Sequence, residues 1–387
     1  MKRLLPLLLV FLAACVHVQE TPTPSIGPSA AYPPEAAPSL TAVLREKRTE
    51  SFCGETVPLD QPAVREMLER ELVMIVWDRP QVIMWLKRSG RCFPVITDML
   101  YRQGLPADLK YVAVAESSLM AHAGSPKGAM GYWQFIKPTA KKYGLRVDEK
   151  MDERRSLMKS TEAAARYLAD LKQRLGSWTL AAAGYNMGEE GLEGEIAVQK
   201  VHDYYQLYLP LETQRYLFRI LAIKMVMENP ARFGFDIAPA DLYPPLSVDM
   251  VDARCLREAP VTLVAEAAHT TFRRIKELNP DIRGHYLPEN VGRLLVPAGE
   301  GTGFCERYSR AFDSWLNLLD GKVVTVKAGD TLASIARENR VPLSAILIWN
   351  RLSADKPLSP GQKILIYFDP SRIQEQKETE AADKPIE

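Results

Sequence analysis

The sequence has little net charge, few cysteines and histidines, and no long apolar run. Its 387 residues carry 49 Lys and Arg against 48 Asp and Glu, so no positive field attracts nucleic acid and no excess charge keeps the chain unfolded. The one segment apolar enough to enter a membrane, residues 4–14, is shorter than the roughly 20 residues of a spanning helix. The five histidines are scattered and no two cysteines have short ligand spacing, so we predict no metal and no cofactor. What remains is an ordinary globular composition, 47% hydrophobic, long enough for two or three domains.

The N-terminal residues have the pattern of an export signal. Two basic residues precede the apolar run 4–14, which ends at Cys15, as in a secretory signal peptide. Residues 12–15 resemble a bacterial lipobox, in which the peptide is cut before the cysteine and the cysteine is acylated. Several acyl chains on one residue anchor stably. Because Val16 replaces the Asp that usually retains lipoproteins in the inner membrane, the resemblance implies an outer-membrane lipid anchor facing the periplasm. A plain signal peptide with an incidental cysteine is the alternative.

The rest of the chain divides by composition. Residues 21–38 hold six prolines, which favour an extended tether. From Pro62 to Phe235 apolar residues recur at helical spacing with almost no strand alternation; one such helix has Ser160 or Thr161 as a possible N-cap and Gly176 at its end. The predicted segments are a signal peptide 1–15, a Pro-rich tether 16–50, an all-α domain 51–235, small mixed modules 250–305 and 322–368, and a disordered charged tail 369–387. The fold class is therefore multi-domain α+β.

Four cysteines remain beside Cys15: Cys53, Cys92, Cys255 and Cys305. An exported protein meets an oxidising environment, so two disulfides are expected. Sequence alone does not determine the connectivity. Pairing Cys53 with Cys92 and Cys255 with Cys305 is our hypothesis, because it keeps each bridge inside one predicted domain.

Glu116 is the candidate catalytic residue. Leu109, Val112 and Ala113 form an apolar stripe at positions i, i+3 and i+4 of a predicted helix, and Glu116 is its i+7 member. Burial and the negative end of the helix dipole both raise the pKa of such a carboxyl group. A carboxylic acid that stays neutral near pH 7 can protonate a glycosidic oxygen. The alternative is a glutamate at the edge of the stripe, paired with a Lys or Arg.

Polar and glycine motifs follow Glu116 in a fixed order. They are Ser125, Gly128-x-x-Gly131-x-x-Gln134, Tyr185-Asn186-x-Gly188 and Glu212-Thr213. The paired glycines predict tight turns beside a ligand, and Gln134 offers an amide to the polar groups of a sugar. Taken singly, each motif also fits a plain turn or helix cap.

In this order the motifs resemble the soluble lytic transglycosylase-like domain, and most closely the membrane-bound D-type murein transglycosylases. The family's Glu-Ser motif matches Glu116 and Ser117, and its later motifs match in turn. The resemblance is good over 105–235 and weaker back to Pro62, and the run 152–155 also fits the D-type pattern. Three residues depart from the family: Tyr132, where Leu is usual, and Gly184 and Met187, where Ala is usual. They would alter the walls of the subsites and leave the chemical groups in place.

The resemblance implies a lysozyme-like α-helical fold that cuts the β-1,4 bond between N-acetylmuramic acid and N-acetylglucosamine in peptidoglycan. The muramic acid's 6-hydroxyl closes on its own C1 and leaves a 1,6-anhydro end. An intramolecular acceptor needs no activated water, so Glu116 alone can act as acid and then base, where hydrolases usually need two carboxylates. By the same resemblance, Tyr185 and Asn186 orient the 2-acetamido group and the acid, while Ser125 and Gln134 hold neighbouring polar groups.

Ser117 and Glu212 are predicted to support the site from behind the residues that touch substrate. For Glu212 two interpretations stay open. It positions Tyr185 or Arg215, or it is a charge at a helix N-terminus with no further role.

Residues 322–368 resemble a LysM module. A strand, two short helices and a second strand are predicted, with Gly329-Asp330-Thr331-Leu332, Trp349-Asn350 and Pro360-Gly361-Gln362 at the family's positions. LysM modules bind glycans that contain N-acetylglucosamine. The resemblance places the binding edge at Gly329, Asp330, Thr331 and the loop 349–353, with Asn350 among its residues. A protein-contact module is the alternative.

The segment 250–305 repeats this pattern in degenerate form. Thr262-Leu263 and Leu278-Asn279 echo Thr331-Leu332 and Trp349-Asn350 at offsets of 69 and 71 residues, but the Gly-Asp-Thr signature is missing. We interpret 250–305 as a degenerate LysM-like module stapled by Cys255 and Cys305. The sequence leaves open whether this module binds glycan.

Two other functions fit much of the same sequence. A goose-type muramidase would hydrolyse the same bond with the same fold and lone glutamate. A non-catalytic, lipid-anchored wall binder would use the lipid, the tether and the LysM module alone. The expected partners are peptidoglycan glycan strands and, through the lipid, a membrane; no motif points to nucleic acid or identifies a protein partner.

Overall fold

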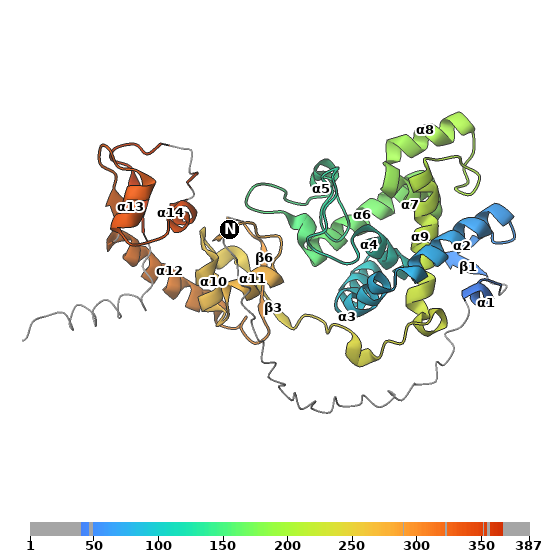
Figure 1. The fold of residues 1–387 in the computed structure, drawn as a ribbon, viewed down its shortest axis with the longest axis horizontal. Coiled ribbons are helices and arrows are strands. Elements are labelled where there is room, and N and C mark those ends of the chain that lie inside the picture. The colour runs from blue at the N-terminus through green and yellow to red at the C-terminus, as the bar shows by residue number, and fades with distance from the viewer. Residues whose placement is uncertain are drawn as a thin grey trace, which may run out of the picture.

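The computed structural model describes residues 40–45, 49–288, 290–321, 323–350, 352–353 and 357–366. The predicted signal peptide 1–15 with its Cys15, most of the tether 16–50 and the tail 369–387 lie outside these residues. The described chain forms three hydrophobic clusters, and the three bodies that hold them lie in a row (Figure 1). Among the described helices, none combines the length and the apolar character needed to cross a bilayer.

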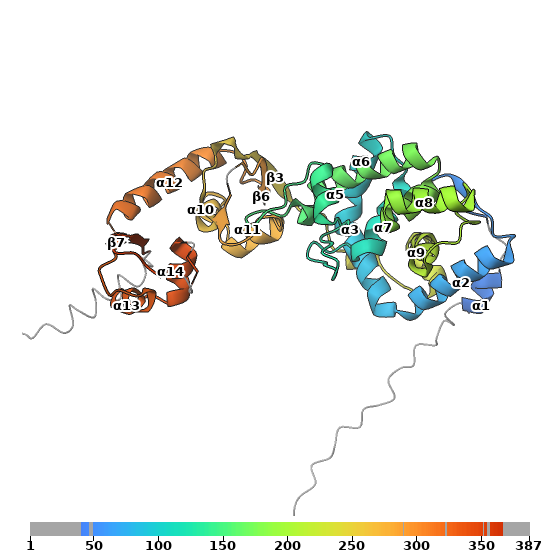
Figure 2. The same cartoon turned by 90° about the horizontal axis from the view of Figure 1, so that it is seen from above.

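The first body, here called the helical domain, packs its helices around α9. Its elements are α1 (Leu40–Arg45), β1 (Glu50–Phe52), β2 (Glu55–Val57), α2 (Pro62–Trp77), α3 (Arg79–Arg102), α4 (Lys110–Ser117), α5 (Lys137–Lys142), α6 (Leu157–Leu175), α7 (Trp178–Met187), α8 (Glu189–Gln199) and α9 (Leu211–Glu228), with short 3-10 turns between them. Helix α9 packs against α2, α4 and α7 and is viewed nearly along its axis in Figure 2. Helix α9 buries apolar side chains in several directions around its axis, so that other helices can pack on more than one of its sides.

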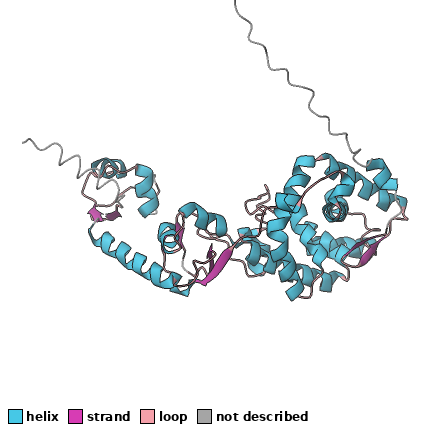
Figure 3. Ribbon diagram, turned by 90° about the horizontal axis from the view of Figure 1, so that it is seen from below, coloured by secondary structure: helices cyan, strands magenta, loops and turns pink. Residues whose placement is uncertain are grey.

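The sequence did not reveal the hairpin β1–β2, which pairs Glu50 with Val57 in antiparallel register. Each strand has three residues, too few for an alternating pattern to stand out. Phe52 and Val57 are buried in the core of the helical domain and attach the hairpin to it. Figure 3 shows how little of the molecule is strand.

Helix α6 begins earlier than the sequence predicted. Its N-cap is Ser156, whose side chain accepts from the Lys159 N–H, so assigning the cap to Ser160 or Thr161 was wrong. Both lie fully buried inside the helix. Burial of their hydroxyl groups is tolerated because each has a hydrogen-bond partner: Ser160 Oγ donates to the Ser156 carbonyl, and Thr161 Oγ1 accepts from the Trp133 indole. Gly176 ends α6 in the left-handed conformation, as predicted.

Two small modules follow. The middle module contains β3 (Val248–Asp252), β4 (Ala259–Pro260), α10 (Val261–Ala267), α11 (Phe272–Leu278), β5 (Tyr286–Leu287), β6 (Arg293–Pro297) and the long helix α12 (Phe304–Gly321). The C-terminal module contains β7 (Val323–Thr325), α13 (Leu332–Glu338), α14 (Leu343–Asn350) and β8 (Lys363–Leu365). In both, the first and last strands of a βααβ unit pair antiparallel. The predicted fold class, multi-domain α+β with a helical domain ahead of βααβ modules, is confirmed.

The two modules correspond at one constant offset through their helices. Helices α10 and α13 begin at Val261 and Leu332, 71 residues apart, and Asn279 and Asn350 have the same separation. The offset of 69 residues that aligned Thr262 with Thr331 was wrong. Thr331 precedes α13 as its N-cap, and the residue that precedes α10 is Pro260.

One asparagine in each module holds the last strand. The Asn279 side chain donates to α11 and to the Leu295 carbonyl and accepts from the Leu295 N–H, all within 2.8–3.0 Å. The Asn350 side chain makes the same three bonds with α14 and Leu365, within 2.6–2.9 Å. The repeat is therefore structural, with one polar residue serving the same purpose twice.

Of the four cysteines within the described residues, two pair, and both belong to the middle module. Cys255 and Cys305 form a disulfide that ties the end of β3 to α12. Cys53 and Cys92 are free, so the hypothesis that they pair was wrong. The backbone N–H of Cys53 donates to Asp108 from the turn of the β1–β2 hairpin, whereas Cys92 lies in the middle of α3 and lines a hollow together with Tyr132. The two cysteines therefore lie in different parts of the helical domain.

Candidate active site

A cleft of about 680 Å³ opens where α4, α6, α7 and α9 meet the loop 125–136. Its lining includes Glu116, Ser125, Gln134, Tyr185, Asn186 and Glu212, together with Pro126, Lys127, Ala129, Phe135, Ile136, Thr139, Tyr167, Met187, Gly188 and Glu189. The fold thus brings together the residues predicted for catalysis and for substrate binding in the helical domain. They come from segments almost 100 residues apart, because α4, α7 and the start of α9 converge on one end of the helical domain.

Glu116 lies in the last turn of α4 with its carboxyl group on the cleft. No Lys or Arg within the described residues forms an ion pair with it, so the alternative of a paired surface glutamate does not hold. Burial raises the pKa of Glu116 to about 7, against the opposing effects of the Tyr216 hydroxyl and the Arg219 charge, while the Glu212 charge raises it further. A large share of the carboxyl groups is therefore protonated at neutral pH.

Tyr216 is the site residue that sequence reasoning missed. It lies in α9, is almost completely buried, and donates its hydroxyl proton to Glu116 Oε1. Because Oε1 accepts this bond, the acidic proton of the neutral carboxyl group belongs on Oε2. The available signal was that Tyr216 follows Glu212 by one helical turn on the same face of α9, and that a buried phenol needs an acceptor.

Tyr185 does not orient the acid as predicted. Its hydroxyl donates to the Trp133 carbonyl over 2.6 Å, and its ring forms part of an aromatic wall. The rings of Tyr185 and Tyr167 lie 5.2 Å apart, and that of Tyr143 lies 4.8 Å from Tyr167. Such a wall can pack against the apolar faces of sugar rings.

The loop with Ser125 and Gln134 is held tightly by its own backbone. Gln134 Nε2 donates to the carbonyls of Ala123 and Gly131, each over 2.9 Å, so only its amide oxygen is free for substrate. Ser125 Oγ accepts from the Ala129 N–H over 3.2 Å, which leaves the hydroxyl proton to donate. The two residues therefore present one acceptor and one donor to the cleft.

Ser117 lies behind the cleft. It is buried, and its hydroxyl donates to the Tyr132 carbonyl over 2.7 Å. This bond joins the end of α4, one residue beyond Glu116, to the loop that carries Gln134.

Asn186 is oriented from α9. Its Oδ1 accepts from the Thr213 hydroxyl over 2.9 Å, which turns the Nδ2 donors away from that contact. Glu212 lines the cleft from the first turn of α9, but Arg215 pairs with buried Glu71 over 2.6 Å. Of the alternatives left open for Glu212, the positioning of Arg215 through a direct ion pair is not observed.

Glu189 is the third carboxyl group of the cleft and is poorly suited to proton transfer. Although burial opposes its ionisation, the Tyr167 hydroxyl and Lys142 lower the pKa of Glu189 to about 2. Tyr167 donates to it over 2.7 Å and Lys142 lies 3.0 Å away. Glu189 is ionised throughout the physiological range and holds the aromatic wall in place.

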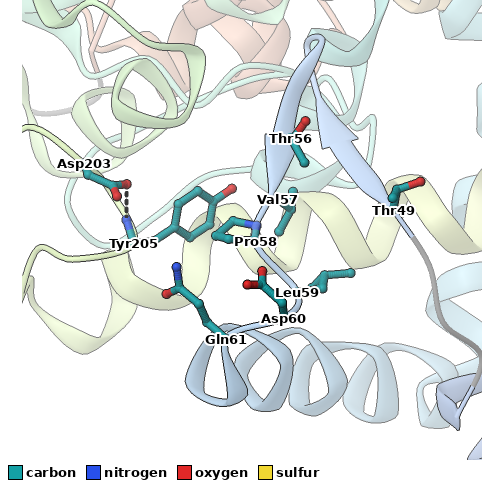
Figure 4. A pocket seen from close by; sticks show the side chains of 9 residues that line it. All are labelled: Thr49, Thr56, Val57, Pro58, Leu59, Asp60, Gln61, Asp203 and Tyr205. Carbon is teal, nitrogen blue, oxygen red and sulfur yellow. Dashed lines mark hydrogen bonds between the residues drawn. The ribbon is translucent and has the colours of Figure 1, made fainter.

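A second hollow, of about 520 Å³, lies between the β1–β2 hairpin, the start of α2 and Tyr205 (Figure 4). None of the predicted site residues lines it. Its carboxyl groups are those of Asp60 and Asp203, and Asp203 already accepts from the Tyr205 N–H and from Gln206.

The C-terminal module uses its predicted glycan-binding residues in its own turns. Thr331 caps α13 by accepting from the Ser334 N–H over 3.0 Å, and Asp330 accepts from the Lys327 N–H over 2.7 Å. Gly329 has a φ of 92°, which glycine adopts readily. The Asn350 amide nitrogen donates to α14 and β8 and its oxygen accepts from β8, so no amide N–H is left to donate to a glycan. Its role is to hold the strand.

Comparison with known protein families matches two segments of the chain, one in the helical domain and one in the C-terminal module. Residues 95–207 match the family model of the transglycosylase SLT domain, and residues 324–366 match that of the LysM domain. The chain thus carries an SLT domain followed by a LysM domain, as the sequence motifs indicated.

Among individual proteins, the chain is similar to membrane-bound lytic murein transglycosylase D of Escherichia coli, strains K12 and O6:H1. It is 30% identical to each over 287 residues, which cover 70% of this chain and 62% of the relative. The chain therefore spans less than two thirds of the length of these relatives. A solved structure of the lytic transglycosylase Slt from Pseudomonas aeruginosa aligns with 17% identity and a TM-score of 0.29, covering 39% of this chain and 26% of that one.

Proposed function

We propose that this protein is a lytic transglycosylase of peptidoglycan. It cleaves the β-1,4 bond between N-acetylmuramic acid and N-acetylglucosamine and leaves a 1,6-anhydromuramoyl end. The observation that carries the proposal is Glu116, a carboxyl group with a pKa of about 7. It lies on a cleft that is large enough for sugar rings and is lined by aromatic and polar side chains. The similarity to murein transglycosylase D over most of this chain supports the same reaction class.

The reaction divides into two proton transfers by one side chain. Neutral Glu116 gives its Oε2 proton to the glycosidic oxygen, the bond from that oxygen to C1 breaks, and N-acetylglucosamine leaves with a free 4-hydroxyl. The carboxylate then takes the proton of the muramoyl 6-hydroxyl as that oxygen bonds to C1. Glu116 ends protonated and no water is consumed. A tethered acceptor has an effective concentration far above that of any free alcohol, which removes the need for a second carboxylate as base.

The surrounding groups hold the sugar during these steps. The Nδ2 donors of Asn186 would bind the carbonyl oxygen of the muramoyl 2-acetamido group and hold that group where it supports the positive charge at C1. Ser125 donates and the Gln134 oxygen accepts on neighbouring hydroxyl groups. Tyr216 keeps the Glu116 carboxyl in one orientation, so that the same atom delivers and receives the proton.

Hydrolysis is the second candidate, because Glu212 shares the cleft and its charge acts on Glu116. A second carboxylate could activate a water, as in inverting glycosidases. Digested peptidoglycan is expected to contain ends lighter by one water than hydrolysed reducing ends, as measured by mass spectrometry. Digestion in ¹⁸O-water is expected to leave these ends unlabelled, and Glu212→Gln should still form them. Labelled reducing ends that disappear in Glu212→Gln would establish the hydrolase instead.

Tyr216→Phe is expected to move the alkaline limb of the kcat/KM profile upward by about one pH unit. Activity falls as pH rises through the pKa of the acid, and the phenol lowers that pKa by donating to the ionised form. A hydrogen bond to a charged group contributes about 1.5 kcal/mol or more, which is about one pKa unit. Tyr185→Phe is the control, since its hydroxyl bonds to Trp133; an equal shift there would contradict the role of Tyr216.

Outside the helical domain, we propose that the LysM module binds glycan through its turn at 329–331 and raises the local concentration of substrate. An acylated Cys15 and the tether 16–50 would hold the helical domain 51–235 at the periplasmic face of the outer membrane. The modules 250–305 and 322–368 would extend from it along the wall. Labelling of cells with a palmitate analogue, with Cys15→Ala as control, tests the anchor.

A further inference from the structure

The middle module is joined to the helical domain by more than the connecting chain. Met151 of the helical domain is fully buried, and its side chain belongs to the hydrophobic cluster of the middle module. Its backbone forms a bridge with Ile282. The Asp152 N–H donates to the Asp281 carbonyl over 2.8 Å, and the Arg283 N–H donates to the Lys150 carbonyl over 2.9 Å. Residues 150–152 therefore pair with residues 281–283 as a short antiparallel bridge, in the manner of a brief added strand.

Charged groups reinforce the contact. Lys159 Nζ lies 2.9 Å from Asp281 Oδ2, and the Asp281 side chain is 7% exposed. Lys150 pairs with Glu258 over 2.8 Å at the rim. A buried pair of this kind is costly to break, because a lone buried charge is left behind.

These contacts cover a particular edge of the middle module. At the constant offset of 71 residues, Glu258 corresponds to Gly329, and residues 278–282 correspond to the loop 349–353. In the C-terminal module, Gly329 and Thr331 are exposed on that edge. In the middle module, the equivalent edge is occupied by the helical domain.

From this contact a short chain of bonds leads to the cleft. Asp152, buried, holds Arg154 with two bonds of 2.8 Å. Arg154 Nη1 in turn donates to the carbonyls of Gly128 and Phe135, over 2.8 and 3.0 Å. One guanidinium group thus fastens both ends of the loop 128–135, and Gln134 lies within that loop.

We propose that the middle module is a docking element for the helical domain: it binds the segment 148–159 through its LysM-type edge and, through Asp152 and Arg154, positions the substrate-binding loop. Glycan is excluded from this edge because the edge is already filled. The kinetic part of this proposal rests on the proposed function. The structural part, an ordered loop that depends on docking, does not.

The test compares variants of Lys159 in the full chain. Lys159→Ala is expected to raise KM for soluble glycan chains about 5-fold. Because Glu116 is untouched, kcat should change less than 2-fold and the alkaline limb of the pH profile should stay at the same pH. Lys159→Arg should restore KM. Arg273→Ala is the matched control, because Arg273 forms an ion pair of 2.8 Å with Glu277 on the exposed face of α11. Equal KM values for Lys159→Ala and Arg273→Ala would overturn the proposal.

Hydrogen exchange tests the structural part without catalysis. The Met130 and Gly131 N–H groups bond to the Phe135 and Ala123 carbonyls, and they should exchange at least 10-fold faster in Lys159→Ala. Met151→Ala, which leaves no buried charge, should act in the same direction if Lys159→Ala does not fold. Unchanged exchange in a folded docking variant contradicts the proposal even if the protein cleaves peptidoglycan. A chitin tetrasaccharide that deprotects residues 148–159 would show that glycan competes for the edge, which also overturns it.

Discussion

Glu116→Gln is expected to lower the turnover of purified peptidoglycan by at least about 10²–10⁴-fold, the usual contribution of a general acid. The amide has nearly the same shape and cannot give up a proton, so both proton transfers are lost. Release of soluble muropeptides, followed by chromatography, measures the loss. Comparable turnover by this variant would leave the non-catalytic wall binder as the better description of the protein.

The same variant carries its own control for folding. The pKa of Glu116 is raised from 4.5 to about 7 in the folded protein, so the folded state binds more protons than the unfolded state and loses stability as pH rises through this window. Gln lacks this titration. Glu116→Gln should therefore be more stable than the parent at pH 8, by up to about 3 kcal/mol, in denaturant unfolding, and the two should converge near pH 4. A variant that is inactive and also unstable at pH 8 would point to a structural defect.

Gly131→Ala is expected to lower the free energy of unfolding by several kcal/mol. Gly131 has a φ of +83°, and a Cβ placed there would lie 1.8 Å from the Arg154 carbonyl oxygen. The left-handed backbone costs a non-glycine residue about 1–2 kcal/mol, and an overpacked contact adds about 1–3 kcal/mol or more. Because the clash displaces the loop from Arg154, the variant should also bind glycan chains more weakly, as a raised KM.

Gly128→Ala separates the cost of the left-handed backbone from the cost of the steric clash. Gly128 has a similar φ of +79°, but nothing lies within 4 Å of the position that a Cβ would take there. It should therefore show only the backbone cost. Thermal unfolding of both variants makes the comparison, and equal losses would mean that the close approach of Arg154 is unimportant.

The motifs were a reliable guide to which residues surround the cleft and a poor guide to what their polar atoms do. Gln134 and Tyr185 line the cleft as predicted, yet the Gln134 nitrogen and the Tyr185 hydroxyl are bonded to main-chain carbonyls. The Asn350 side chain is likewise committed to main-chain groups through both its nitrogen and its oxygen. A sequence shows that a donor exists, but its partner depends on backbone groups that only folding brings near.

Tyr216 illustrates the same limit from the other side. It lies 100 residues from Glu116, and periodicity within α9 says only that it faces inward. Cys53 and Cys92 are a second case. In the sequence their pairing was as plausible as that of Cys255 with Cys305, yet in the folded protein both thiols are free.

By itself the sequence determined the helical periodicity of the first domain, the left-handed stop at Gly176, the two βααβ units and the inward direction of Glu116. These features depend on residues within one or two turns of each other, whose spacing decides which face is apolar. Only the tertiary structure decided that Tyr216 bonds to Glu116, that Cys255 and Cys305 are the pair that joins, and that the middle module holds Met151 and Asp152 of the helical domain. Each of these joins segments distant in sequence, and such contacts follow from how whole faces pack rather than from any local pattern.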